Sequence, residues 1–405
     1  MRMFAQEDSS VFDTLDHDKH RQRREPWNPY FSKQSVTRLQ PTLIQSKVDK
    51  LCERLSEHQQ EGKPVVMIYA YATLTVDIIS EYSYPEGYNY LDKPDFDRQN
   101  YDAFMTFTQM CHLFKQFRWL IPLFHHTPLW LLKNMDPDAY LAVSFRRDLH
   151  KQAEELHRRR DAKQYDREGK RPSLLEAVLE SKLPESDKAP ERMASEAQTA
   201  IAAGTLTSTH VLKFASYHIL AKPAILERLM TELERAIPDP DAPLTLKELE
   251  SLEYTAAIMW ESLRGTHGTT HRLQRICPDQ AIQYRNYSLP PGTIASMTGV
   301  HLHNDPEIFP DPFDFKPERW LPLQSEGQRL QRFIGSFGKG SRQCIGIELA
   351  KAEILTTLAT VFRKFGRGME LYETEQARDI DIQRDFFNPL PSKQSNGLMV
   401  MFKKG

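Results

Sequence analysis

One cysteine of this 405-residue chain stands where its neighbours suit the chemistry of a metal-bound thiolate. Cys344 lies in the segment from Phe337 to Gly346, between a glycine-bearing turn and the expected first turn of a helix. Unpaired backbone N–H groups and the positive end of the helix dipole at such a position favour negative charge on sulfur. A thiolate that donates electrons to iron favours cleavage of the O–O bond. The residues therefore indicate a thiolate ligand of a redox-active iron.

The residues around Cys344 each have a use beside a flat macrocycle. Gly340 and Gly346 let the backbone pass close to a ring, Arg342 can pair with a carboxylate, and Phe337 can pack on a ring face. A lone cysteine in a glycine-rich turn is more often a buried packing residue. Here the segment matches all the fixed positions of the pattern F-x-x-G-x-R-x-C-x-G.

This segment resembles the haem-ligand loop of the cytochrome P450 family. The resemblance implies haem b (iron protoporphyrin) as the cofactor, with Cys344 as the axial iron ligand, Arg342 as a propionate contact and Phe337 as a ring-packing neighbour. It also implies the family fold: mainly α with small β-sheets, as one domain over residues 1–405. A long central helix is expected above the haem, and the cysteine loop just before the last long helix.

A family triad is expected from Glu261, Arg264 and Arg319. Glu261 and Arg264 have the Glu-x-x-Arg spacing, and Arg319 lies in Pro317-Glu-Arg-Trp320. Such pairs are usually solvated and weak, and the spacing recurs at Glu155, Glu232 and Glu375. Trp260 and Leu263 flank Glu261 on a core helix, so we expect a structural triad and not a catalytic acid.

The expected long helix, 191–221, would measure about 45 Å and contains Ala203-Gly204-Thr205-Leu206-Thr207. In the family a similar element crosses the haem, its glycine leaves room for oxygen, and its threonine helps deliver protons; Ala203, Gly204 and Thr207 match these positions. Read alone, the small residues favour close helix packing. Leu206 departs from the family, in which this position is commonly acidic, and a leucine cannot relay protons.

The basic run from His20 to Arg24 is open to three interpretations, the first of which is a nucleic-acid or targeting patch. Short basic runs are usually solvated surface. The resemblance instead assigns His20 and Arg24 to a helix that contacts haem propionates, although Pro26 fits a helix poorly. Arg272 is a weaker match to a further propionate contact. His303 is interpreted as a surface or packing histidine without chemistry.

The elements that must position these residues are mostly helices. Periodic segments predict helices over 34–57, 76–81, 101–119, 138–164, from Thr245 to Gly265, and 347–365. Short strands are expected over 281–289 and 293–298, and loops with short strands over 380–402.

Composition excludes several classes of protein. The net charge of −2 and the scattered cysteines, Cys52, Cys111, Cys277 and Cys344, favour neither nucleic acid, nor a disulfide scaffold, nor a structural zinc site. Met1–Ser10 lacks the order of a secretory signal. The apolar stretch Trp119–Leu132 is too short to span a membrane, and it is interpreted as a membrane-surface contact or a buried loop. We expect a cytosol-facing protein, with peripheral contact to the endoplasmic reticulum as one alternative.

The resemblance implies an oxygen-dependent monooxygenase that hydroxylates a lipophilic molecule in secondary metabolism. No G-x-G-x-x-G fingerprint is present, so electrons are expected from a separate NADPH-dependent reductase. By family position, the pocket lining includes Ala203, Thr207, the 266–271 stretch, Phe386, Phe387 and aromatics of 104–130. The chain resembles fungal membrane-bound members but is expected to lack their N-terminal anchor and first strands. An isomerase or dehydratase without a reductase, and a non-catalytic haem-binding remnant, remain alternatives.

Overall fold

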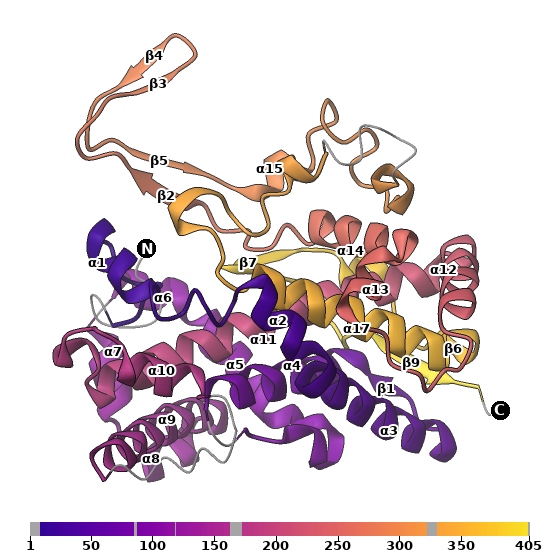
Figure 1. Cartoon of the computed structure of the whole chain (residues 1–405), viewed down its shortest axis with the longest axis horizontal. Helices are drawn as coiled ribbons and strands as arrows, with labels where there is room; N and C mark the ends of the chain where they lie inside the picture. Colours follow the sequence, from indigo (N-terminus) through magenta and orange to yellow (C-terminus); the bar gives the residue numbers. More distant parts are fainter. Residues whose placement is uncertain (1–8, 85–86, 118, 163–171, 322–329, 404–405) are drawn as a thin grey trace.

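The long helix α11 (Pro190–Ala221) runs through the middle of the molecule, as expected from the sequence (Figure 1). Pro190 occupies its first turn, where a missing N–H costs nothing, and Pro223 opens the next helix. Helices α4, α9, α14 and α17 pack against α11. Most of its side chains are buried, so it forms the axis of the core.

The computed structural model describes residues 9–84, 87–117, 119–162, 172–321 and 330–403. The predicted class is confirmed: the chain is mainly helical with small sheets. The longer helices besides α11 are α1 (His17–Arg24), α3 (Gln45–Glu61), α4 (Met67–Ser83), α5 (Arg98–Gln109), α9 (Pro137–Asp161), α12 (Pro223–Ala236), α14 (Glu253–Gly265) and α17 (Ile347–Phe365). The shorter ones are α2 (Lys33–Leu39), α6 (Cys111–Gln116), α7 (Leu120–His126), α8 (Leu129–Met135), α10 (Leu174–Glu180), α13 (Leu246–Ser251) and α15 (Gly299–His303).

Several helix predictions differ from the structure. The 101–119 stretch forms two helices, α5 and α6, which are divided at Met110 and end at Gln116. Helix α4 begins at Met67, nine residues before the predicted start at Val76, because nearly all its side chains are buried and no polar face marks its period. The Thr245–Gly265 stretch forms two helices that meet at Leu252. The predicted capping box is present: the Thr245 N–H donates to Glu248 at 2.8 Å, and the Glu248 N–H donates to Thr245 at 3.3 Å.

The strands form four small antiparallel sheets. The three-stranded sheet has the order β1 (Val65–Val66), β9 (Met399–Phe402), β6 (Met369–Leu371), with Val65 opposite Val400 and Met369 opposite Phe402. The pairs are β2 (Leu273–Ile276) with β5 (Ile294–Met297), β3 (Ile282–Tyr284) with β4 (Tyr287–Leu289), and β7 (Arg384–Phe386) with β8 (Asn388–Leu390). The β2–β5 ribbon and the β3–β4 hairpin project from the helical body (Figure 1).

One hydrophobic cluster reaches from Trp27 to Phe402 and so joins both ends of the chain. Residues 1–8 of the predicted polar start lie outside the described residues. No helix in the described part of the chain is long and apolar enough to cross a membrane.

Candidate active site

Two turns place Cys344 just ahead of α17. The N–H of Gly338 donates to Gly335 O at 2.8 Å, that of Gln343 to Gly340 O at 3.0 Å, and that of Cys344 to Phe337 O at 2.8 Å. Gly338 and Gly340 have φ of +65° and +74°, and a Cβ at either would meet nothing within 4 Å. The left-handed backbone alone therefore favours glycine at both positions.

Solvent reaches the Cys344 side chain, but other residues fill most of the volume around it. This burial raises the pKa of the thiol, while the N–H of Gly346 and the positive charge of Arg24 act in the opposite direction. Among the described residues, no group of three or more His, Cys, Asp or Glu could hold a metal ion.

Cationic residues gather beside the Cys344 loop. Arg24 of α1 donates from Nη1 to Gln343 O at 2.8 Å, one residue before Cys344. Arg342 donates to Thr14 O at 2.6 Å and to Leu15 O at 2.9 Å, which ties the loop to the chain before α1. Helix α1 ends at Arg24, two residues before Pro26. Pro26 therefore does not interrupt the helix that carries His20 and Arg24.

The cationic cluster has few anions of its own. The pKa of His20 is lowered to about 4, chiefly by burial and then by the nearby charges of Arg342 and Arg24. For Arg342, burial and the charges of Arg275 and Arg24 lower the pKa, and only Asp16 raises it. A group that carries carboxylates beside an accessible thiolate would complete this arrangement, so these residues fit haem.

The structure brings His20, Arg24 and Arg342 together but not Arg272. Arg272 is exposed just before β2, and no interaction joins its side chain to the other three among the described contacts. Arg275, three residues later on β2, lies near Arg342 instead. The position of Arg275 near Arg342 could not be predicted from the sequence, because it depends on the register between β2 and β5.

Helix α11 has one open face in an otherwise buried helix. Ala203 is exposed and Thr207, one turn later, is half-buried; Thr207 Oγ1 donates to Ala203 O at 2.8 Å. Gly204 faces α4 and not the open face: a Cβ at this position would come within 2.9 Å of Ile79. Close helix packing therefore accounts for Gly204, while Leu206 is buried on another face.

The three members of the predicted triad meet in a fully buried site. Arg264 donates to Glu261 from Nε at 2.9 Å and from Nη2 at 2.8 Å, and Arg319 Nε lies 3.2 Å from Glu261. Trp320 Nε1 also donates to Glu261 at 2.9 Å, and Arg264 Nη1 donates to Pro312 O at 2.7 Å. The carboxylate thus anchors the 310–320 segment to α14.

His303 links this triad to the Cys344 loop. It is fully buried, so the surface interpretation was wrong and the packing interpretation holds. Its carbonyl accepts from Arg264 at 3.0 Å, and its Nε2 accepts from the Gly335 N–H at 2.8 Å. The ring of His267 stacks on it, with centroids 5.6 Å apart. No local sequence pattern predicts that His303 connects the triad to the Cys344 loop.

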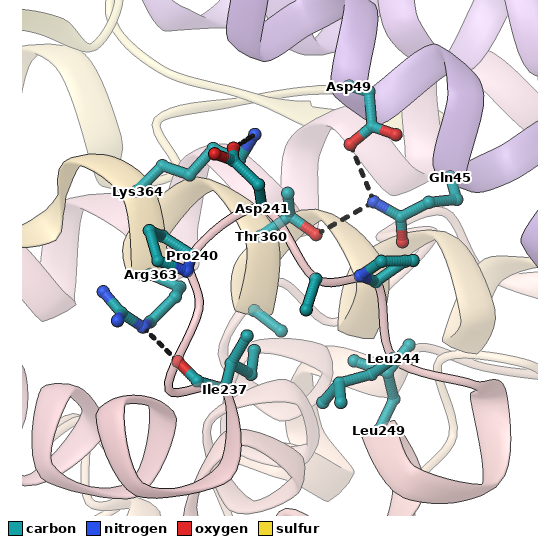
Figure 2. A pocket seen from close by; sticks show the side chains of 13 residues that line it. Gln45, Asp49, Ile237, Pro240, Asp241, Leu244, Leu249, Thr360, Arg363 and Lys364 are labelled. Carbon is teal, nitrogen blue, oxygen red and sulfur yellow. Dashed lines mark hydrogen bonds and ion pairs between the residues drawn. The ribbon is translucent and has the colours of Figure 1, made fainter.

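The pocket in Figure 2 lies away from these residues, where α3 and α17 meet the loop before α13. Its polar groups are paired with one another: Gln45 with Asp49 at 2.9 Å, Arg363 with Ile237 O at 2.6 Å, and Lys364 with Asp241 at 2.8 Å. We assign it a structural role.

Comparisons with known proteins identify the family of this chain. Residues 4–395 match the family model described as Cytochrome P450. The chain is 40% identical to the cytochrome P450 monooxygenase tpcC of Cochliobolus heterostrophus, over 97% of this chain and 76% of that protein. It is 35% identical to the tryptophan 6-hydroxylase fscE of Fusarium equiseti, over 98% of this chain and 76% of that protein.

A solved structure shares the fold. The crystal structure of a cytochrome P450 (CYP102L1) superimposes with a TM-score of 0.75 at 18% identity, covering 98% of this chain and 81% of that one. The chain belongs to the cytochrome P450 family, which implies a haem cofactor and a redox partner, and it is a cytochrome P450 monooxygenase.

Proposed function

We propose that this monooxygenase hydroxylates a lipophilic small molecule in fungal secondary metabolism, with O₂ and electrons from a separate NADPH-dependent cytochrome P450 reductase. The observation that carries the proposal is the accessible Cys344 thiol beside a cationic cluster in which Asp16 is the one anion that raises the pKa of Arg342 among the described residues. The relatives support the metabolic role, since one is a tryptophan 6-hydroxylase and another, 33% identical, is an N-acetyltryptophan 6-hydroxylase of Emericella nidulans.

Haem b, when bound, would supply oxygen activation with the Cys344 thiolate as its axial ligand. The residues that would hold it are Cys344 for the iron, the neutral His20 with the cations Arg24 and Arg342 for the propionates, and Phe337 for the ring face. On the solvent-accessible face of α11, the hydroxyl of Thr207 donates its proton in a hydrogen bond to the carbonyl of Ala203. Each of these roles belongs to the proposal.

Aromatic side chains support a lipophilic substrate. The ring of His112 lies 5.4 Å from Phe386 and 6.1 Å from His271, and Phe387 lies 6.4 Å from His271. This packing joins the 266–271 stretch, Phe386 and Phe387, which were expected to line one pocket. Phe387 has φ of +78°, a strained conformation for a bulky residue, and such strain is common at ligand sites.

The first test is the absorption spectrum of the haem-reconstituted chain after reduction and addition of carbon monoxide. We expect a red-shifted Soret band typical of thiolate ligation, lost in Cys344→Ala and kept in Cys277→Ala, which removes a partly exposed cysteine elsewhere. A Cys344→Ala variant that binds haem and keeps this band would overturn the assignment.

The second part of the test concerns the electron source. Tryptophan, N-acetyltryptophan and a set of apolar terpenoids and fatty acids are incubated with the protein, with and without NADPH and reductase. Hydroxylated product only when both are present supports the proposal. Product formed without them would indicate the isomerase or dehydratase alternative, and haem binding without any turnover would indicate the non-catalytic one.

A further inference from the structure

A buried ammonium group lies among the residues that were expected to line the substrate pocket. Lys115 of α6 is half-buried, and its Nζ is fully covered and has no hydrogen-bond partner among the described residues. A buried lysine is usually paired, because its ammonium group loses hydrating water. The position of Lys115 therefore favours an anion that the described part of the chain does not supply.

Three segments far apart in the sequence meet near Lys115. His112 and Lys115 are three residues apart on α6, so they lie on neighbouring parts of one helix face. His112 Nε2 donates to the carbonyl oxygen of Asp385 at 2.8 Å, which joins α6 to β7. The ring of His271, from the stretch after α14, lies 6.1 Å from that of His112. The pKa of His271 is lowered chiefly by burial and then by the charge of Lys115, so the ammonium group is close to this ring.

The described neighbours leave the charge of Lys115 without an ion pair. The pKa of Lys115 is lowered by burial, and Cys111 and Asp385 oppose this change. Burial raises the pKa of the Cys111 thiol, so this neighbour is neutral at pH 7. Asp385 uses Oδ1 to accept from Thr270 Oγ1 and from the N–H of Phe387, both at 2.8 Å. A carboxylate brought by a ligand would stabilise the ammonium group directly.

Aromatic rings surround the two histidines. The ring of Phe386 lies 5.4 Å from His112, and that of Phe387 lies 6.4 Å from His271. Phe12 meets Phe387 edge-on at 6.1 Å. One cation beside a cluster of rings is typical of a site for a lipophilic ligand, where a polar contact fixes the orientation and apolar groups supply most of the contact area.

We propose that Lys115 binds the carboxylate of a lipophilic carboxylic acid, whose apolar part contacts the rings of His112, His271 and Phe386. The inference rests on the proposed function and names the chemical class of its substrate. Lys115 is thus a residue that determines substrate specificity. It takes no part in the chemistry at the iron.

The charges around Lys115 favour a carboxylate over a phosphate or sulfate ester. One ammonium group neutralises one negative charge, and the carboxylate of Asp385 would repel a second. Arg272 also acts on His271, but it is exposed and remains hydrated. The site lacks a guanidinium fork that could hold three oxygens, so a monoanion fits it best.

Calorimetric titration of the haem-reconstituted full chain tests this specificity without a reductase. The probes are two acids, decanoate and indole-3-propionate, and the primary amide of each, which keeps the apolar part and removes the charge. At pH 7.5 we expect each acid to bind about 10- to 100-fold more tightly than its amide, the range for a hydrogen bond between charged groups. Acids that bind no more tightly than their amides, or fail to bind, would contradict the proposal.

Lys115→Met should remove the preference for the acids and leave the affinity for the amides within about twofold. Lys115→Arg should retain part of the preference, because it keeps the positive charge. Lys151→Met is the control: it removes a lysine that is 75% exposed on α9, and the preference should not change. The melting temperature of Lys115→Met should not fall, since the substitution removes an ammonium group without a described partner.

A Lys115→Met variant that binds haem and still prefers the acids overturns the proposal, as does equal loss of the preference in Lys151→Met. If Lys115→Met does not fold, the comparison of acid with amide in the wild type and in Lys115→Arg decides. A wild-type chain that prefers the acids but never hydroxylates them with NADPH and reductase would contradict the proposed function and support the role of Lys115.

Discussion

At the scale of single residues, the Cys344 loop is held by side chains from far earlier in the chain. Arg24 donates to the carbonyl of Gln343, and its guanidinium also lies near the Cys344 sulfur. A hydrogen bond from a charged group contributes about 1.5–3 kcal/mol, and less where the donor is partly exposed. We expect Arg24→Gln to release haem about ten times faster than the wild type, measured by transfer of haem to excess apomyoglobin.

The matched control for Arg24 is Arg21→Gln, which removes an exposed arginine from the same helix. It changes the net charge equally, so a general charge effect would speed haem loss in both variants. A contact specific to the Cys344 loop predicts that only Arg24→Gln releases haem faster. Equal rates in the two variants would exclude the proposed role of Arg24.

At the scale of elements, Glu261 joins α14 to the segment before the Cys344 loop. Removing its charge leaves Arg264 and Arg319 buried without their carboxylate, which costs about 3–5 kcal/mol for a buried ion pair. We expect Glu261→Gln to lower the free energy of unfolding by that amount and to reduce haem uptake. Denaturant unfolding, followed by circular dichroism, measures the first effect, and Soret absorbance measures the second.

Glu155→Gln is the control, because Glu155 and Arg158 have the same spacing on an exposed surface, 2.7 Å apart. Its cost should stay within about 1 kcal/mol, as for other surface pairs. Similar costs at the two positions would mean that burial of the triad does not determine its strength.

The difference between these two pairs also shows what sequence could reveal. The Cys344 turn and the course of α11 could be predicted, because glycine and proline act locally on the backbone. The triad needed the neighbouring Trp260 and Leu263 as context. His112 and Asp385 could not be paired, because they lie 273 positions apart and neither local pattern indicates the other. The same holds for the bridge at His303, which depends on how α14 packs.

At the scale of the whole molecule, exposed apolar side chains lie on α7 and α8 and just before α7, and Figure 1 shows both helices on the left of the molecule. Trp119, just before α7, is 65% exposed, Leu123 is 59% exposed and Trp130 is 68% exposed. The stretch is helical and not a loop, and it is buried only in part: Leu132 belongs to a small hydrophobic cluster against which Phe124 and Leu129 pack. We propose that it contacts a membrane surface on the cytosolic side, since exposed aromatic and aliphatic residues on short helices favour the interface.

The membrane contact is tested with vesicles of phosphatidylcholine. Full burial of one large apolar side chain contributes about 1.5–3 kcal/mol, so a double variant, Trp119→Ser with Trp130→Ser, should bind vesicles at least about tenfold more weakly in a flotation assay. Phe313→Ser is the control: Phe313 is 85% exposed in the segment that follows α15, and Figure 1 shows α15 away from α7 and α8. Equal losses in the control and the double variant would mean that general hydrophobicity, and not this surface, governs binding. A wild-type chain that does not float with vesicles would exclude the contact altogether.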